Sequence, residues 1–417
     1  MNELLIHIVN TYGTPVFVYQ LDAVQTRIAD AREIFGNRFS LSYAVKSNPN
    51  PTILQRLKNQ VEILDISSGG ELVKAIAVGW SPERLSFTGP GKHDAELQAA
   101  IEHRIGWVII ESVHEANRLN RFAEQAGIIQ PILIRINPMK LPRGFGVNMA
   151  GKPSQFGIDE EEINQAIESI IQLRHLRLCG FHIYSGTQCL RSEAIVENYQ
   201  IFIDIFSRVC ETHQLKPEKL IFGSGLGIPY HENDQPIELK TIAEHINPAL
   251  DVLRTQPRFA QTDFVLEVGR YFIGEAGLYL TRVINKKSSR GATICICDGG
   301  MNHHLGACGH LGSVIHRNYQ MFKVINQETE QLATLQPYEL FGPLCTSIDR
   351  LGHSVQFPGL NIGDTIAIRC SGAYGPTASP VYFISHEPPK EILVETINGV
   401  LNIQDISHIP HQVDNIH

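Results

Sequence analysis

Long apolar runs are missing from this sequence of 417 residues. No stretch approaches the roughly 20 consecutive apolar residues that a membrane-spanning helix needs. The opening MNELLIHIVNTYG also has no basic segment leading into the apolar core of a signal peptide. These two absences predict a cytoplasmic protein that is not inserted in a membrane.

An excess of positive charge is also absent, because 35 Lys and Arg residues face 43 Asp and Glu residues and give a net charge of -8. A protein that binds a phosphate backbone needs a clustered positive surface. The charge balance therefore argues against nucleic acid as a partner.

A cysteine framework is the third missing feature. The eight cysteines are scattered, and several lie in apolar, strand-like contexts such as Cys295 and Cys297. This distribution predicts reduced thiols, in keeping with the cytoplasm, and no disulfide framework.

What is present is a regular alternation of short β-type runs and longer helical segments, such as the segment from Glu160 to Leu173. A chain of this length with 43% hydrophobic residues can bury more than one core, so two domains are expected. Eight alternating units predict an α/β fold with a parallel (β/α)8 TIM barrel. The eight runs are Arg38 to Val45, Val61 to Ile66, Arg84 to Thr88, Trp107 to Glu111, Pro131 to Ile136, Leu176 to Ile183, Leu220 to Gly223 and Asp263 to Glu267.

After Arg270 the helical period fades and β-rich runs follow, which predicts a second, mostly β domain. The N-terminal run from Val16 to Tyr19 is expected to join that domain, because a ninth barrel strand has no place. The predicted barrel covers residues 26–268, and the β domain covers residues 1–25 and 269–417. The later runs are Leu278 to Asn285, Thr293 to Asp298, Thr365 to Arg369 and Glu391 to Glu395.

In a barrel of this kind, active-site residues follow the C-terminal ends of the strands. Lys46 follows the first strand, where its amine can act as a nucleophile, although most lysines in such loops are simply solvated. The seventh strand runs into Gly223-Ser224-Gly225-Leu226-Gly227, which reads as a phosphate cradle or as an ordinary turn.

The sixth and eighth strands also end in polar groups. His182 and Tyr184 project to the same face by strand alternation, so either ring could stack on a planar cofactor, while His182 could equally be a hydrogen-bonded histidine of the barrel interior. Glu267 and Arg270 end the eighth strand and could instead form a structural ion pair. Beside a pyridinium nitrogen, the Glu267 carboxylate would keep that ring an electron sink.

In the β domain, Cys345 has a polar, turn-rich context unlike the other cysteines. Its protonated thiol could donate a proton to a carbanion, with a buried structural cysteine as the alternative. The string from Met301 to His310 is rich in His and Cys, but adjacent histidines point in different directions on a strand. We therefore expect a substrate-facing loop there and no metal site.

Eight motifs, in order, resemble those of the fold-type III pyridoxal-phosphate decarboxylases, the family of the ornithine and diaminopimelate decarboxylases. They are YAVKSNPN, DISSGGEL, FGIDEEE, GFHIYSGTQ, GSGLGIPY, EVGR, GPLCTSID and SGAYGP. The resemblance runs from about residue 13 to residue 385, and the ordered set is far more specific than any one glycine loop.

The resemblance implies an alanine-racemase-like barrel followed by a β-sandwich or β-barrel domain, in a homodimer with shared active sites. Cys345 of one subunit would enter its partner's site and protonate the substrate carbon. Pyridoxal 5'-phosphate would be carried by Lys46 as a Schiff base, with Glu267 at the pyridine nitrogen and either His182 or Tyr184 against the ring. Phosphate contacts are implied for Gly225, Gly227, Gly269, Arg270 and Tyr374.

The departures from the family pattern concern the substrate. Diaminopimelate decarboxylases have a glutamate where this chain has Thr346, and an arginine and a tyrosine in the region of Asn302 and His303. Thr346, Asn302 and His303 are thus the predicted substrate contacts, without the clamp for a distal charge.

The motifs GGMNHHL, GVNMAGKPSQFGID and GFHIYSGTQ resemble a subgroup that decarboxylates L-glutamate held on an acyl carrier protein in antibiotic biosynthesis. A decarboxylase of a free amino acid such as diaminopimelate or ornithine is the alternative. A racemase would need a second base, and a non-catalytic protein would not need both Lys46 and Cys345.

Overall fold

The protein was analysed as a computed structural model, which describes residues 1–311, 317–324 and 334–407. The chain divides into two compact units. The barrel unit contains Arg27–Gly227 and Pro236–Gly269. The β unit contains Met1–Thr26, Ile228–Gln235 and the described residues from Arg270 onward.

The barrel unit is built around eight parallel strands that close on themselves, because β5 pairs with β6 and β12 pairs with β2. This confirms the predicted (β/α)8 barrel. The strands are β2 (Ser40–Ala44), β3 (Ile63–Ile66), β4 (Leu85–Phe87), β5 (Trp107–Ile110), β6 (Gln130–Asn137), β9 (Leu176–Ile183), β11 (Lys219–Gly223) and β12 (Asp263–Val268).

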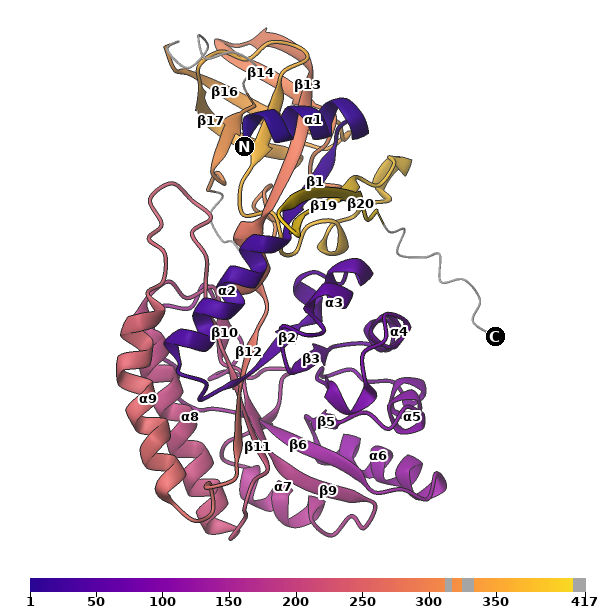
Figure 1. Ribbon diagram of the computed structural model, residues 1–417, viewed down its shortest axis with the longest axis vertical. Coiled ribbons are helices and arrows are strands. Elements are labelled where there is room, and N and C mark those ends of the chain that lie inside the picture. Colours follow the sequence, from indigo (N-terminus) through magenta and orange to yellow (C-terminus); the bar gives the residue numbers. More distant parts are fainter. Residues whose placement is uncertain (312–316, 325–333, 408–417) are drawn as a thin grey trace. The chain divides into compact units, whose positions relative to one another are not determined.

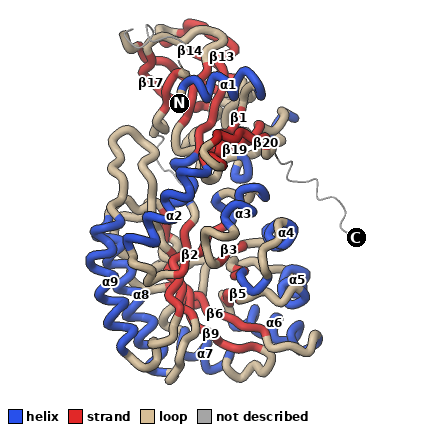
Figure 2. The backbone as a smooth tube through the Cα atoms, in the orientation of Figure 1, coloured by secondary structure: helices blue, strands red, loops and turns tan. Residues whose placement is uncertain are grey.

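Helices surround these strands (Figures 1 and 2). Each helix buries one apolar face, and several begin at a serine that caps free backbone N–H groups. At α6, for example, the Glu115 N–H donates to the Ser112 hydroxyl at 3.1 Å. The helices are α2 (Leu21–Ile34), which begins in the β unit, α3 (Pro51–Leu57), α4 (Gly69–Ala77), α5 (Asp94–Glu102), α6 (Val113–Gln125), α7 (Ile163–Ile170), α8 (Ser192–Thr212) and α9 (Leu239–Thr255).

One layer of the barrel interior consists largely of apolar side chains. Its side chains come from six strands and are all nearly inaccessible to solvent, so this layer is packed protein and not a channel. Its members are Ile63, Ile109, Leu133, Cys179, Ile221 and Val265.

The β unit contains a nine-stranded mixed sheet among its described residues. At its centre β13 pairs with three other strands, so the sheet branches there. The strands are β1 (Val16–Gln20), β13 (Gly277–Ser289), β14 (Ala292–Cys297), β15 (Met321–Lys323), β16 (Gln336–Phe341), β17 (Arg350–Phe357), β18 (Thr365–Ile368), β19 (Lys390–Ile397) and β20 (Val400–Asp405).

The N-terminal strand joins this sheet as expected, because β1 pairs antiparallel with β13 and parallel with β19. Helix α1 (Asn2–Tyr12) packs Leu5, Ile8 and Val9 into the apolar cluster on the sheet. The predicted separate β domain is therefore confirmed. Among the described residues, no helix is long and apolar enough to cross a membrane.

His304 is a neutral histidine in the core of the β unit. Its side chain is 1% exposed and its ring lies within 6 Å of the rings of Phe17, Tyr279 and Tyr319. Its Nε2 atom lies 3.0 Å from the Ser371 hydroxyl, and its Nδ1 atom accepts a hydrogen bond from the Ala307 N–H at 3.3 Å. Burial lowers the pKa of His304 to about 3.

Because His304 is buried in its neutral form, we expect the β unit to lose stability in mild acid. The pKa in the folded chain lies below the ordinary value of about 6.5, so its stabilisation is complete above that value and is lost as the pH falls. Between pH 8 and pH 5, protonation of His304 in the unfolded chain lowers the free energy of unfolding by about 2 kcal/mol.

The measurement is the pH dependence of urea unfolding for the native chain and for His304→Gln. We expect a shallower pH dependence for His304→Gln, and no change for His245→Gln, which alters an exposed histidine. Equal pH dependence in all three proteins would contradict the assignment.

Candidate active site

A charged layer lies directly above the apolar layer of the barrel, toward the C-terminal ends of the strands. Because side chains alternate along a strand, a residue two positions after an interior residue also faces the interior. This relation links Ile63 to Asp65, Ile109 to Glu111, Leu133 to Arg135 and Val265 to Glu267, and all four charged residues are at most 6% exposed.

In strand β9, three residues rather than two separate the apolar layer from the charged layer. Its pairing with β6 shifts by one residue between Ile132 and Leu133, so Cys179 is the extra residue of a β-bulge. Gly180 has φ +153° there, and a Cβ on it would lie 1.8 Å from the Lys219 carbonyl oxygen. The bulge brings His182, three residues after Cys179, next to Glu267.

His182 and Glu267 form a buried pair, with Nε2 and Oε2 3.1 Å apart. Burial lowers the pKa of His182, so the imidazole is neutral and donates its Nε2–H. Burial alone would raise the pKa of Glu267, but the hydrogen bond from His182 and the positive charges of Lys46 and Arg135 outweigh it, and the pKa falls below its ordinary value. Glu267 is thus a buried carboxylate that stays ionised.

Asp65 is the opposite case, and it was not singled out from the sequence. It is fully buried, and burial together with the Glu267 charge raises its pKa well above the ordinary value. Thr88 donates a hydrogen bond to Oδ1, whereas Oδ2 has no hydrogen-bond partner within the described residues. Two carboxyl groups whose pKa values are driven apart are typical of a site that handles protons.

Lys46 belongs to the same group of side chains. It lies in a 3-10 turn, η1 (Val45–Ser47), at the end of β2. Its Nζ is 5.6 Å from the centroid of the Tyr184 ring. The Lys46 charge lowers the pKa of Glu267 and opposes the increase that burial causes in the pKa values of Asp65 and Glu71, so the predicted amine and the predicted carboxylate share one electrostatic site.

Arg135 is held by an ion pair in the same layer. Its guanidinium lies 3.3 Å from both carboxylate oxygens of Glu111, and the ring of Phe156 covers it at 4.6 Å. Glu111 accepts two further hydrogen bonds of 2.8 Å, from the N–H groups of Gly89 and Gly157. The charges of Arg135 and Lys92 and the two backbone N–H groups keep this buried carboxylate ionised, and its pKa is lowered despite burial.

The glycine segment after β11, which the sequence predicts as a phosphate cradle, is tightly packed. Gly225 has φ +67°, and a Cβ on it would lie 2.6 Å from the Phe145 ring. The N–H of Gly227 donates to the Cys189 carbonyl at 2.8 Å. A Cβ on Gly223 would overlap the Tyr184 ring at 2.2 Å, so the small residue makes room for that ring. Gly269, after β12, lies against Ser47.

Two further buried polar atoms line this part of the barrel unit. The hydroxyl of Ser185 and the Nδ1 atom of His182 have no hydrogen-bond partner within the described part of the chain. A buried polar group without a partner is costly unless a ligand satisfies it. An amine, an ionised carboxylate, a glycine cradle and unsatisfied polar atoms together fit pyridoxal phosphate.

Arg270 and Tyr374 lie together in the β unit. The Arg270 Cζ atom is 4.6 Å from the centroid of the Tyr374 ring and 5.4 Å from that of Tyr230, and the guanidinium also donates to the Tyr230 hydroxyl. Burial opposes its charge, but these tyrosines keep the pKa of Arg270 above its ordinary value. Its Nε atom is buried and lacks a partner among the described residues. Sequence reasoning missed Tyr230.

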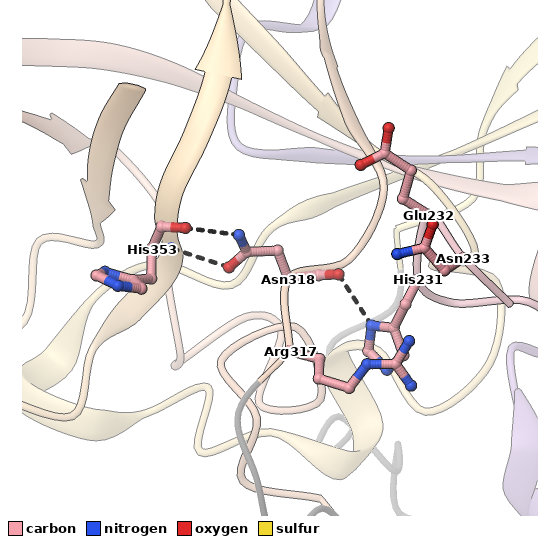
Figure 3. Close-up of a pocket in the computed structure, with 6 residues that line it drawn as sticks. All are labelled: His231, Glu232, Asn233, Arg317, Asn318 and His353. Atoms are coloured by element: carbon pink, nitrogen blue, oxygen red, sulfur yellow. Dashed lines mark hydrogen bonds between the residues drawn. The ribbon is translucent and has the colours of Figure 1, made fainter. Parts of the chain in front are cut away.

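A polar pocket of about 280 Å³ in the β unit is lined by His231, the residue that follows Tyr230 in the chain. Figure 3 shows Asn318 between two of the segments that line it. Its side chain bonds the backbone of His353 at 2.7 and 2.9 Å, and its carbonyl lies 2.9 Å from His231 Nδ1. These bonds fix the next residue, Tyr319, whose ring centroid is 4.6 Å from that of Tyr230.

Cys345 lies in the loop between β16 and β17 and is the one exposed residue among the eight free cysteines. Buried Asp349 holds this loop: its carboxylate accepts from the Leu344 N–H at 2.8 Å and from the Met301 N–H at 2.6 Å. One carboxylate therefore joins the Cys345 loop to the segment that begins at Met301.

The predicted substrate residues differ in exposure. Thr346 is half-buried beside Cys345, whereas Asn302 and His303 are 0% and 2% exposed. The His303 ring lies within hydrogen-bond distance of the Tyr279 hydroxyl, the Asn302 amide and the Glu387 carbonyl. Each ring nitrogen thus has a protein neighbour. In the described ranges, no three His, Cys, Asp or Glu side chains gather as metal ligands.

Known proteins share this organisation. The family profile "Pyridoxal-dependent decarboxylase, pyridoxal binding domain" matches residues 21–274. The L-glutamyl-(BtrI acyl-carrier protein) decarboxylase of Niallia circulans is 32% identical over 386 residues, covering 92% of this chain and 89% of that protein. The diaminopimelate decarboxylase of Bacillus subtilis is 27% identical and covers 94% and 89% of the two chains.

Among solved structures, the diaminopimelate decarboxylase of Helicobacter pylori complexed with L-lysine superposes with a TM-score of 0.83. Its identity is 27%, and the match covers 96% of this chain and 95% of that one. The profile spans the whole barrel unit, and the relatives span both units. The chain belongs to the family of pyridoxal-phosphate-dependent decarboxylases and is a carbon-carbon lyase.

Proposed function

We propose that the enzyme decarboxylates L-glutamate carried as a thioester on an acyl carrier protein, giving a γ-aminobutyryl carrier in antibiotic biosynthesis. The observation that carries this proposal is the neutrality of the predicted substrate region. Burial lowers the pKa of His303 to about 4, and Thr346 and Asn302 have no charge. A free dicarboxylic or dibasic substrate would need an opposite charge there.

A thioester removes that need, because it converts the distal carboxylate of glutamate into a neutral group. The carrier-linked substrate then presents only its α-amino and α-carboxylate groups as charges. The 32% identity to the Niallia circulans enzyme, which is named for such a substrate, supports the same conclusion.

The residues of the barrel unit are assigned as follows. Bound pyridoxal phosphate supplies an electron sink for the bond that breaks. Lys46 would hold it covalently, Glu267 would keep its ring nitrogen protonated, and Gly225, Gly227, Gly269, Arg270 and Tyr374 would hold its phosphate. We propose that the imidazole of His182, which is 3.1 Å from the Glu267 carboxylate and is oriented by it, stacks on the cofactor ring. Tyr184, whose ring lies near Lys46 Nζ, would instead face the substrate.

Cys345 is assigned as the proton donor after carbon dioxide leaves. Its thiol is exposed, on a loop that Asp349 fixes, so it is available to a second subunit. We propose a homodimer in which each Cys345 serves the partner's site, with Thr346, Asn302 and His303 near the substrate. All eight cysteines are free thiols, which supports a cytoplasmic enzyme.

A second candidate is the decarboxylation of a free amino acid. The identities of 27% and 28% to the diaminopimelate decarboxylases of Bacillus subtilis and Aquifex aeolicus, over nearly the same length, favour it, since cofactor residues do not distinguish the two substrates.

The substrate is tested by mass spectrometry of the carrier. Purified enzyme with pyridoxal phosphate is incubated with L-glutamyl-loaded BtrI acyl-carrier protein and, separately, with free glutamate, ornithine and diaminopimelate. We expect the carrier species alone to lose the mass of one carbon dioxide. Release of carbon dioxide only from a free amino acid would replace the proposal with the second candidate.

The Lys46→Ala variant is expected to lose covalent attachment of the cofactor and nearly all turnover, because no other amine is assigned to that position. Attachment is measured as the mass added after borohydride reduction. Lys216→Ala, which removes an exposed lysine of the barrel unit, is the control and should keep both properties. Full turnover in Lys46→Ala would exclude the assigned role.

The Cys345→Ala variant is expected to bind the cofactor normally and to release aberrant products, because the substrate carbon is then protonated from the wrong position or not at all. Product identity is followed by chromatography in deuterated water, and Cys345→Ser serves as the variant of equal size. An unchanged product and rate in Cys345→Ala would rule out this donor.

A further inference from the structure

The segment between β6 and α7 carries an unusual charge pattern for this acidic protein. We call residues Pro138–Gly157 the rim loop. It contains Lys140, Arg143 and Lys152 and no acidic residue, whereas the whole chain has a net charge of -8. All three basic side chains are exposed, together with the apolar side chains of Met139 (55%) and Val147 (37%).

The first half of the rim loop is tied to the glycine segment of the candidate site. The Phe145 ring packs so close to Gly186 and Gly225 that a Cβ on either would lie within 3.1 Å of it. Strand β7 (Val147–Asn148) pairs with β10 (Gly186–Thr187), and the Met149 N–H donates to the Ser185 carbonyl at 2.8 Å. The basic surface is therefore fixed beside the residues assigned to the cofactor.

The second half is tied to the charged layer of the barrel. Phe156 covers the Arg135 guanidinium, and the Gly157 N–H donates to Glu111 at 2.8 Å. Two anchors thus hold the loop against the barrel interior while its three cations remain outside. A surface loop that only connected β6 to α7 would need neither anchor.

Acidic residues border the rim loop, so the positive charge is confined to the loop itself and Arg191. Glu160 accepts from the Met139 N–H at 2.9 Å and pairs with Arg208, so its charge is compensated. Exposed Arg191 adds a fourth cation, because its guanidinium reaches the Arg143 carbonyl at 3.5 Å. Exposed Asp159, Glu161 and Glu162 follow the loop before α7, and exposed Glu193 follows Arg191, so these carboxylates mark the edge of the positive surface.

We propose that the rim loop, with Arg191, is the docking surface for an acyl carrier protein whose face around its phosphopantetheine arm is acidic. This inference rests on the proposed function. Complementary charge raises the rate of encounter and fixes the orientation of a partner, and the exposed apolar side chains supply contact area once it is docked. A small free amino acid would have no use for such a surface.

The test compares the native enzyme with the triple variant Lys140→Glu, Arg143→Glu, Lys152→Glu. A second triple variant, Lys216→Glu, Lys287→Glu, Arg290→Glu, changes the net charge equally at exposed positions elsewhere. Steady-state kinetics are measured with L-glutamyl-loaded BtrI acyl-carrier protein and with a small L-glutamyl thioester of N-acetylcysteamine, at low and high salt.

The rim-loop variant should raise KM for the carrier roughly tenfold or more and leave kcat and the small thioester unchanged. Salt should raise the carrier KM of the native enzyme and have less effect on this variant. An unchanged carrier KM, an equal change in the control variant, or an equal loss with the small thioester would overturn the inference. Failure of the native enzyme to use the loaded carrier would instead reject the proposed function.

Discussion

The structure of the barrel unit depends on keeping several charges ionised where water is excluded. Removing an unpaired ion from water costs several kcal/mol, so such charges persist only with near-complete compensation. Glu111 has Arg135 and two backbone N–H groups, and Glu267 has His182 and the nearby Lys46 charge. Asp65, which lacks a cation of its own, responds instead by a raised pKa.

The β unit also contains a buried charge, Arg270, whose neighbours are neutral tyrosine side chains. Arg270 is surrounded by the rings of Tyr230 and Tyr374 and has no carboxylate partner among the described residues. A guanidinium held by aromatic faces keeps its affinity for an anion, because no fixed negative charge competes. Asn318 is hydrogen-bonded to the His353 backbone, and the ring of the next residue, Tyr319, packs against the ring of Tyr230. In a similar way, the Asp349 carboxylate accepts a hydrogen bond from the Leu344 N–H and so holds the Cys345 loop in place.

The fold was largely predictable because strand alternation and loop composition are local properties. They identified all eight barrel strands, and with them Lys46, His182 and Glu267 at strand ends. Asp65 and Ser185 were within recognised motifs, but each has a buried oxygen atom without a hydrogen-bond partner among the described residues, and that depends on three-dimensional neighbours. Tyr230 and Asp349 act on residues far away in the chain, and Gly223 matters only because Tyr184 lies over it. No sequence pattern encodes these pairings.

The β-bulge in β9 has a consequence for how this site could arise or be altered. In the other strands of the charged layer, an even number of steps separates the apolar layer from the functional one. In β9 the number is odd, because Cys179 is an extra residue in the pairing with β6. The extra residue therefore decides on which face of the strand the His182 imidazole lies. Deleting one residue there would move every later side chain of the strand to the opposite face, which no substitution can achieve.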